Sequence, residues 1–203
     1  MHVHELGLAN LTEAFDRCLT FWHTDPADYA QITEIPNVTA LELAWRNYCL
    51  WHEEDKARRT DVDDGMIAQV KRNIDRFNQQ RNDFIEQLDE EILAWLMARC
   101  SFRDDMPINS ETPGGIVDRI SILSLKVYHM YEDTLRDDID EAHRERSLQK
   151  LAILREQRAD LELALQRLLD DCLSGIRQMK LYRQFKMYND PSLNPELYRQ
   201  IKA

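Results

Sequence analysis

Three helical stretches of this sequence place charged or amide side chains in the middle of faces that are otherwise apolar. The polar members of these faces are Asn47, Glu54, Arg58, Arg81, Asp118 and His129. Burying an unpaired charge costs several kcal/mol, so these groups must meet one another, a ligand or water. An internal polar site is therefore the strongest functional indication in the sequence, although it does not by itself identify a reaction.

Arg81 lies near the centre of the apolar stripe that runs through residues 66–95. Because a guanidinium group stays charged, it needs carboxylate, carbonyl or phosphate partners. Glu54 and Asp118 are the carboxylates that face inward from the neighbouring stretches. Two interpretations follow: a structural ion network that joins Glu54, Arg81 and Asp118, or a site with room for a ligand.

The leading hypothesis is an internal polar pocket that binds a small phosphorylated or carboxylated ligand. Arg81 and Arg58 would grip the anion, and Asn47 would hydrogen-bond beside them. Glu54 and Asp118 would orient the arginines or bind a divalent cation together with the ligand. If the pocket is catalytic, metal-assisted cleavage of a phosphate ester or anhydride is the reaction class to test first. The alternative is a non-enzymatic interaction or dimerisation module, in which the buried charges fix the register of the helices.

His129 lies about three turns after Asp118 on the same predicted helix, too far for direct contact. It could complete the pocket as a proton donor or metal ligand, but a lone inward-facing histidine is more often a hydrogen-bonded core residue. Two neighbouring polar clusters are predicted to lie on exposed faces: His52, Glu53 and Asp55 in one, and Glu86, Asp89 and Glu90 in the other. A dicarboxylate metal site within one helix is therefore weakly supported, whereas a metal ion between helices is left open.

The segment 177–188 carries four cations and three aromatic residues, with no acidic residue among them. Arg183 and Lys186 form a second, weaker candidate for anion binding on this segment. Cations also favour the C-terminal end of a helix, and aromatic residues can anchor a chain tail, so a structural role explains the same pattern.

Long stretches without glycine or proline predict an all-α protein. Apolar residues recur at helical intervals through five stretches, and a short helix is expected in the tail: 10–22, 39–59, 66–95, 114–136 and 140–180. Thr39 and Asp61 are the predicted N-caps of the second and third helices, and segment 109–115 marks the start of the fourth. The predicted fold is an elongated antiparallel bundle of about five helices, two of them long. Residues 1–203 are expected to form one domain, divided into an N-terminal helix and loop (1–38), the bundle (39–180) and a C-terminal tail (181–203).

The net charge of −11 disfavours a broad nucleic-acid or anionic-membrane surface, because the long-range field repels polyanions. No window approaches the roughly 18 apolar residues of a membrane span. The four cysteines are far apart and lack any CxxC pair, which is typical of thiols in a reducing compartment. Since the N-terminus does not read as a secretory signal, the expected location is the cytoplasm.

Four segments carry a family resemblance: 50–58 (LWHEEDKAR), 78–83 (NQQRND), 111–119 (ETPGGIVDR) and 184–191 (QFKMYNDP). Together they resemble the bacterial family called domain of unknown function 4254, over about residues 40–195. The resemblance implies a soluble bacterial protein of roughly this length, and it supplies no activity and no catalytic residues. The segments contain Glu54, Arg58, Arg81 and Asp118, which the helical pattern selects independently.

Overall fold

The computed structural model describes residues 2–24, 37–183, 185, 187 and 190–198. Five helices form the body: α2 (Leu11–Thr24), α3 (Val38–Lys56), α4 (Asp64–Met97), α5 (Pro113–Thr134) and α6 (Glu141–Leu173). Two single-turn helices, α1 (His2–Glu5) and α7 (Pro195–Tyr198), lie near the ends of the chain. The all-α prediction is confirmed, and α4 and α6, of 34 and 33 residues, are the two long helices. None of the helices among the described residues has a stretch apolar enough to cross a bilayer.

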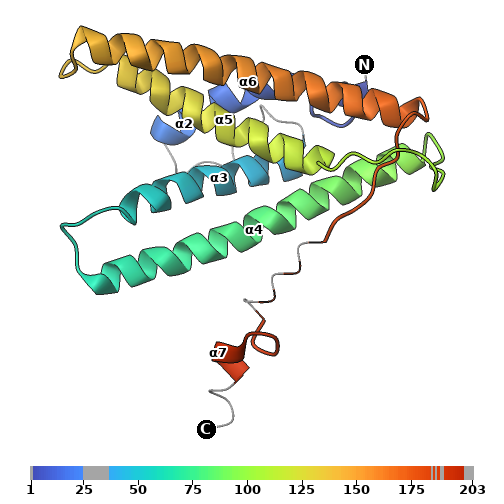
Figure 1. Cartoon of the computed structure of the whole chain (residues 1–203), viewed down its shortest axis with the longest axis horizontal. Coiled ribbons are helices and arrows are strands. Elements are labelled where there is room, and N and C mark those ends of the chain that lie inside the picture. The colour runs from blue at the N-terminus through green and yellow to red at the C-terminus, as the bar shows by residue number, and fades with distance from the viewer. Residues whose placement is uncertain (1, 25–36, 184, 186, 188–189, 199–203) are drawn as a thin grey trace.

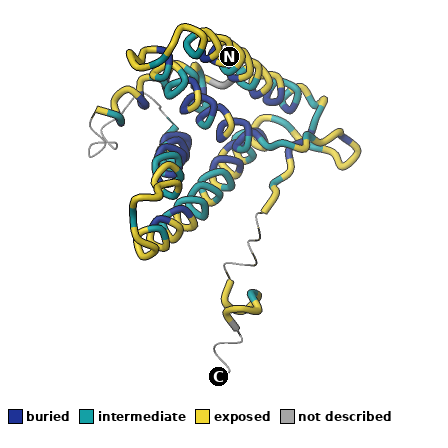
Figure 2. The backbone as a smooth tube through the Cα atoms, turned by 60° about the vertical axis from the view of Figure 1, so that its left-hand side comes forward, coloured by how far each residue is buried: buried dark blue, intermediate teal, exposed yellow. Residues whose placement is uncertain are grey.

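The helices are arranged as two antiparallel hairpins, α3 with α4 and α5 with α6 (Figure 1). Helix α5 is the central element, because it contacts α2, α3, α4 and α6. A helix that packs on several sides needs apolar residues around most of its circumference, which is the pattern that the sequence of α5 shows. Figure 2 shows the buried residues of the helices turned toward the space that the two hairpins share.

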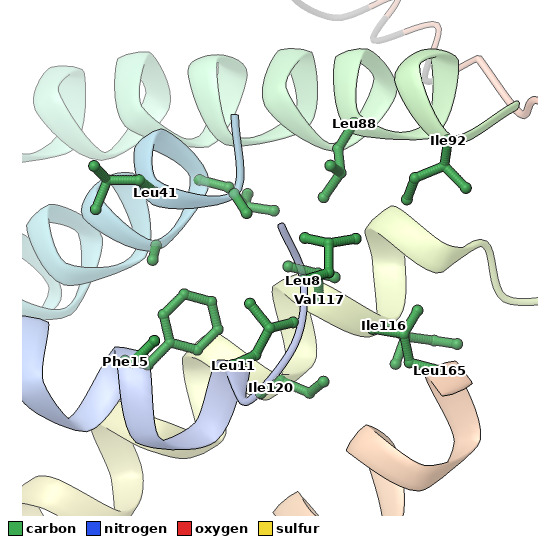
Figure 3. Packing of buried hydrophobic residues seen from close by; sticks show 14 of the residues in the cluster. Leu8, Leu11, Phe15, Leu41, Leu88, Ile92, Ile116, Val117, Ile120 and Leu165 are labelled. Carbon is green, nitrogen blue, oxygen red and sulfur yellow. The ribbon is translucent and has the colours of Figure 1, made fainter. Parts of the chain in front are cut away.

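The main core lies where α2 and the two hairpins converge (Figure 3). Its buried members come from every body helix and include Leu8, Leu11, Phe15, Leu41, Leu88, Ile92, Ile116, Val117, Ile120 and Leu165. A smaller cluster of Leu50, Val70 and Ile74 joins the far ends of α3 and α4. Along α3 and α4, Asn47 and Arg81 lie between residues of these two apolar clusters, so packing on both sides holds their helices in place.

Both predicted N-caps in the first hairpin are wrong by two residues. Asn37, rather than Thr39, caps α3, and its side chain accepts the backbone N–H of Ala40 at 2.8 Å. Asp63, rather than Asp61, caps α4 in the same way. In each case two candidate caps stand close together, and the propensity rules do not distinguish them.

Helix α6 also ends earlier than predicted, at Leu173 instead of near residue 180. Gly175 adopts a φ of 70°, the left-handed conformation that commonly ends a helix. The chain then crosses toward α4, where Gln178 donates its backbone N–H to the carbonyl of Pro107 at 2.9 Å and forms an isolated bridge with Ile108. Residues 174–180, which sequence analysis placed in a helix, therefore lie outside α6. Residues 177–183 form an extended segment, called the strap below.

The start of α5 is pressed against α4, and the helix-entry prediction is confirmed there, with Thr112 as N-cap and Pro113 in the first turn. A Cβ atom on Gly114 would lie 2.7 Å from the carbonyl oxygen of Ile85 and 2.8 Å from Oδ1 of Asp89. The Gly114 N–H donates to that same Oδ1 at 2.7 Å. Asp89 is buried, so the prediction that it is solvated is wrong: it fastens the first turn of α5 to α4.

This close approach predicts that Gly114→Ala lowers the free energy of unfolding by about 2 kcal/mol, because the methyl group must push α5 away from backbone atoms of α4. Gly115→Ala is the matched control. Its Cβ would lie 3.3 Å from Oγ1 of Thr112, a tighter contact than usual but with a side-chain atom rather than with the backbone of another helix, and alanine favours the helix. Urea denaturation of both variants measures the difference. Similar stabilities for the two variants would contradict the tight contact.

Candidate functional site

Asp118, on α5, is the centre of a buried polar layer between α3, α4 and α5. Its side chain is 5 % exposed, and its carboxylate accepts from Nε of Arg81 at 2.7 Å and from Nη2 of the same guanidinium. Asn47, on α3, donates to Oδ1 of Asp118 at 2.9 Å and to Oγ of Ser121 at 2.7 Å. Three of the residues selected from the sequence thus meet from three different helices.

The guanidinium of Arg81 is only partly used by this pairing. The hydrogen bond that Arg81 donates to Asp118 is the main cause that raises the pKa of Arg81, so the charge is firmly held. The side chain is 27 % exposed, and Nη1 has no hydrogen-bond partner among the described residues. A guanidinium group carries five N–H donors, so some of them remain available to an acceptor in the space that Arg81 lines.

That space is an open cleft of about 300 Å³ between α3, α4 and α5. Its polar and aromatic wall includes Asn47, Trp51, Glu54, Arg58, Asn78 and Arg81. Glu54 and Arg58 lie on the rim, where they are 46 % and 70 % exposed and pair with each other at 3.1 Å. The predicted ion network is therefore wrong about Glu54. Glu54 pairs with Arg58, and among the described residues the ion-pair partner of Arg81 is Asp118.

His129 lies apart from this cleft, in a cluster with two other histidines. His23 of α2, His52 of α3 and His129 of α5 each offer one ring nitrogen within 4.8 Å of the other two. Aromatic rings enclose the cluster: Tyr128 stacks on His23 with centroids 4.2 Å apart, and Trp51 stacks on His129 at 4.9 Å. Burial lowers the pKa of both His23 and His52, which favours neutral imidazole rings.

The sequence-based assignment of His52 and Glu53 to an exposed face is wrong. His52 is partly buried within the histidine cluster. Glu53 is buried and accepts from Lys56 at 2.7 Å and from Asn73 of α4 at 3.1 Å. Helix α3 packs against both α4 and α5, so a single predicted inner stripe underestimates how much of its surface is covered.

Sequence reasoning missed His23 altogether, since the first helix was predicted over residues 10–22 and His23 follows directly after it, whereas α2 continues to Thr24. One signal could have found the cluster: each of the three histidines directly follows a large aromatic residue, in the pairs Trp22-His23, Trp51-His52 and Tyr128-His129. The spacing between the pairs matches no known metal motif, so only the fold brings them together.

The weaker anion site is occupied by the protein's own carboxylates. Arg183 contacts Glu86 at 3.0 Å and Glu90 at 2.5 Å, both on α4. Glu86 and Glu90 are therefore ion-pair partners for the strap after α6 as well as surface charges. Lys186, the other residue of that prediction, lies outside the described residues.

Comparisons with known proteins place the chain by family alone. No curated protein and no solved structure matches it. One family model, described as a protein of unknown function (DUF4254), matches residues 37–181, which include the Asp118 layer, the cleft beside it, His52 and His129, and exclude His23. Because this match spans well over half of the 203 residues, the chain belongs to the DUF4254 family.

Proposed function

We propose that this protein binds a small anionic metabolite in the cleft beside Arg81. The observation that carries the proposal is the guanidinium of Arg81, which is held by Asp118 through Nε and Nη2 while the residue lines a cleft of about 300 Å³. A charged donor fixed in place by a buried carboxylate loses little conformational entropy when a ligand binds. Asn47 lines the same cleft and is held by Asp118 and Ser121.

The charges around the cleft narrow the class of ligand. Arg58 and Arg81 are balanced by Glu54 and Asp55 in the lining, so the cleft is not a strongly electropositive funnel for polyphosphates. Trp51 adds an aromatic surface to the wall. A small carboxylate or phosphate monoester that also carries hydroxyl or amino groups fits this mixture, because it can use both the cationic and the acidic side chains. Hydrolysis of a phosphate ester with metal assistance is the activity to assay once a ligand is known.

The rival function is an interaction or dimerisation module, which needs a contiguous apolar surface without a partner. Helix α6 does expose Leu148, Ile153 and Leu163. These residues are separated from one another by more than a turn, and scattered exposed apolar side chains are ordinary on protein surfaces. The cleft is therefore the better-supported site.

The proposal predicts that a thermal-shift screen of carboxylates, sugar phosphates and nucleoside monophosphates, with and without Mg²⁺, raises the melting temperature for a narrow set of ligands. Arg58→Met should weaken the response about tenfold in ligand concentration, because one of the two cations at the cleft is lost. Arg58 is exposed, so this variant should fold normally.

Arg59→Met is the matched control for that screen. Arg59 lies one residue further along, pairs with Asp61 at 2.7 Å and does not line the cleft. Its ligand response should equal that of the wild type. Equal ligand responses in wild type, Arg58→Met and Arg81→Met would show that these arginines do not bind the ligand.

A further inference from the structure

A second site lies outside the proposed anion cleft, at the histidine cluster in which Trp51 stacks on His129. We propose that His23, His52 and His129 bind one divalent transition-metal ion of the Co²⁺ to Zn²⁺ series through the Nε2 atoms of their rings. The inference is independent of the anion cleft, since it rests on other residues and predicts a different class of ligand.

The first argument comes from hydrogen bonding at the opposite ring nitrogens. Nδ1 of His23 lies 2.7 Å from the carbonyl oxygen of Leu19, and Nδ1 of His129 lies 2.9 Å from a carboxylate oxygen of Glu132. Carbonyl and carboxylate oxygens can only accept, so each Nδ1 carries the hydrogen and each neutral ring presents a lone pair at Nε2. Histidines that bind metals show this arrangement, with the second nitrogen donating to an outer carbonyl or carboxylate.

The second argument is that these lone pairs have no other use. Nε2 of His23, of His52 and of His129 is buried, and none of the three has a hydrogen-bond partner among the described residues. A buried polar atom without a partner costs about 1–3 kcal/mol. Three such atoms from three separate helices, brought to one place, indicate a shared partner that satisfies all of them.

The third argument is distance. For three nitrogens no more than 4.8 Å apart, the central point is at most about 2.8 Å from each of them. A Zn–N bond is about 2.0–2.1 Å, so each ring needs to move inward by only about 0.7 Å. Rotation about side-chain bonds supplies such a shift, and the stacked rings of Trp51 and Tyr128 keep the imidazole planes oriented while it happens.

The donor set selects the type of metal. Neutral imidazole suits Zn²⁺, Co²⁺, Ni²⁺ and Cu²⁺, whereas Mg²⁺ and Ca²⁺ prefer oxygen ligands. Three protein ligands leave a fourth tetrahedral position for water or an exogenous ligand, as in catalytic zinc sites. His129 also lines an open, mainly apolar cleft of about 480 Å³ beside α5 and α6, which provides an approach to that position.

The test uses the untagged full-length chain, stripped of metal with a chelator and then titrated with Co²⁺ and Zn²⁺. One Co²⁺ per chain should bind and produce the visible absorption of a four- or five-coordinate ion, and Zn²⁺ should displace it while Mg²⁺ does not. His52→Phe and His129→Phe keep an aromatic ring in place and should lower the Co²⁺ affinity about 100-fold or more. His143→Phe is the control, because His143 is a partly exposed residue of α6 that pairs with Asp133 instead of joining the cluster.

Failure to take up one Co²⁺ per chain would overturn the site, as would equal Co²⁺ affinity in wild type and His52→Phe. Circular dichroism of each metal-free variant shows whether it is folded. If the phenylalanine variants do not fold, Glu132→Gln replaces them, since Glu132 is half exposed and contacts His129 through the outer nitrogen Nδ1. Its Co²⁺ affinity should fall about tenfold, and an unchanged affinity in a variant that circular dichroism shows to be folded would count against the site.

Discussion

Arg81→Met is expected to lower the free energy of unfolding by about 3–5 kcal/mol at neutral pH. The substitution keeps the aliphatic stem but removes the donors that contact both oxygens of Asp118. A carboxylate that is 5 % exposed would then keep only Asn47 as a side-chain donor, so it must be buried with most of its charge uncompensated or take up a proton. Urea denaturation followed by circular dichroism measures the loss.

A double-mutant cycle separates the ion pair from simple loss of packing. Adding Asp118→Leu to Arg81→Met removes both charges, and most of the lost stability should return, because a buried pair can often be replaced by apolar residues at little cost. Arg58→Met is the control for an exposed pair and should cost less than about 1 kcal/mol. If Arg81→Met costs no more than Arg58→Met, the Arg81–Asp118 pair is not the buried centre of this layer.

The Asp118 layer could be predicted from sequence because it obeys helical periodicity. Asn47, Arg81 and Asp118 each interrupt an apolar stripe, and inward-facing stripes of neighbouring helices must meet. Helical periodicity could not show which carboxylate pairs with Arg81. Glu54 and Asp118 were equal candidates for Arg81. In the structure the partner is Asp118, because α5 lies between α6 and the α3–α4 hairpin, whereas Glu54 lies partly exposed near the end of α3.

The histidine cluster could not be predicted in the same way, because it depends on how α2 is placed against α3 and α5. His23 is separated from His129 by 106 positions, and no local pattern states that their helices cross at these residues. The N-terminal helix also lies outside the part of the chain that the DUF4254 model matches. The family match and the periodicity therefore both point to the Arg81 cleft, and only three-dimensional packing reveals the second site.

Asp89 shows a different limit of sequence reasoning, since it lies off the apolar stripe of α4 and is nevertheless buried. The turn that starts α5 covers it, and the Gly114 N–H donates to its carboxylate. The pKa of Asp89 is raised from 3.8 to about 6. Burial is the main cause and nearby Glu86 contributes, while hydrogen bonds from Thr112 and Gly114 partly offset the rise. The folded protein therefore binds this proton more tightly than the unfolded chain does.

The sign of the pH effect follows from that difference. A carboxyl group with a raised pKa in the folded state contributes its full stability below about pH 4 and loses it as the pH rises through about 6. A difference of roughly two pKa units corresponds to about 3 kcal/mol. Asp89→Asn resembles the protonated side chain at every pH, so the stability of this variant relative to wild type should increase by up to about 3 kcal/mol between pH 4 and pH 7.5.

Urea denaturation at a series of pH values measures this change, with the wild type and Asp89→Asn compared at each pH. Asp83→Asn removes an exposed charge from the same helix and controls for the change in net charge. The other charged groups near the first turns of α5, Arg119 and Glu111, pair with each other at 2.8 Å and are the same in both proteins. A stability difference that stays constant from pH 4 to pH 7.5 would show that the carboxyl of Asp89 is solvated, and that α5 does not rest on α4 as closely as Gly114 allows.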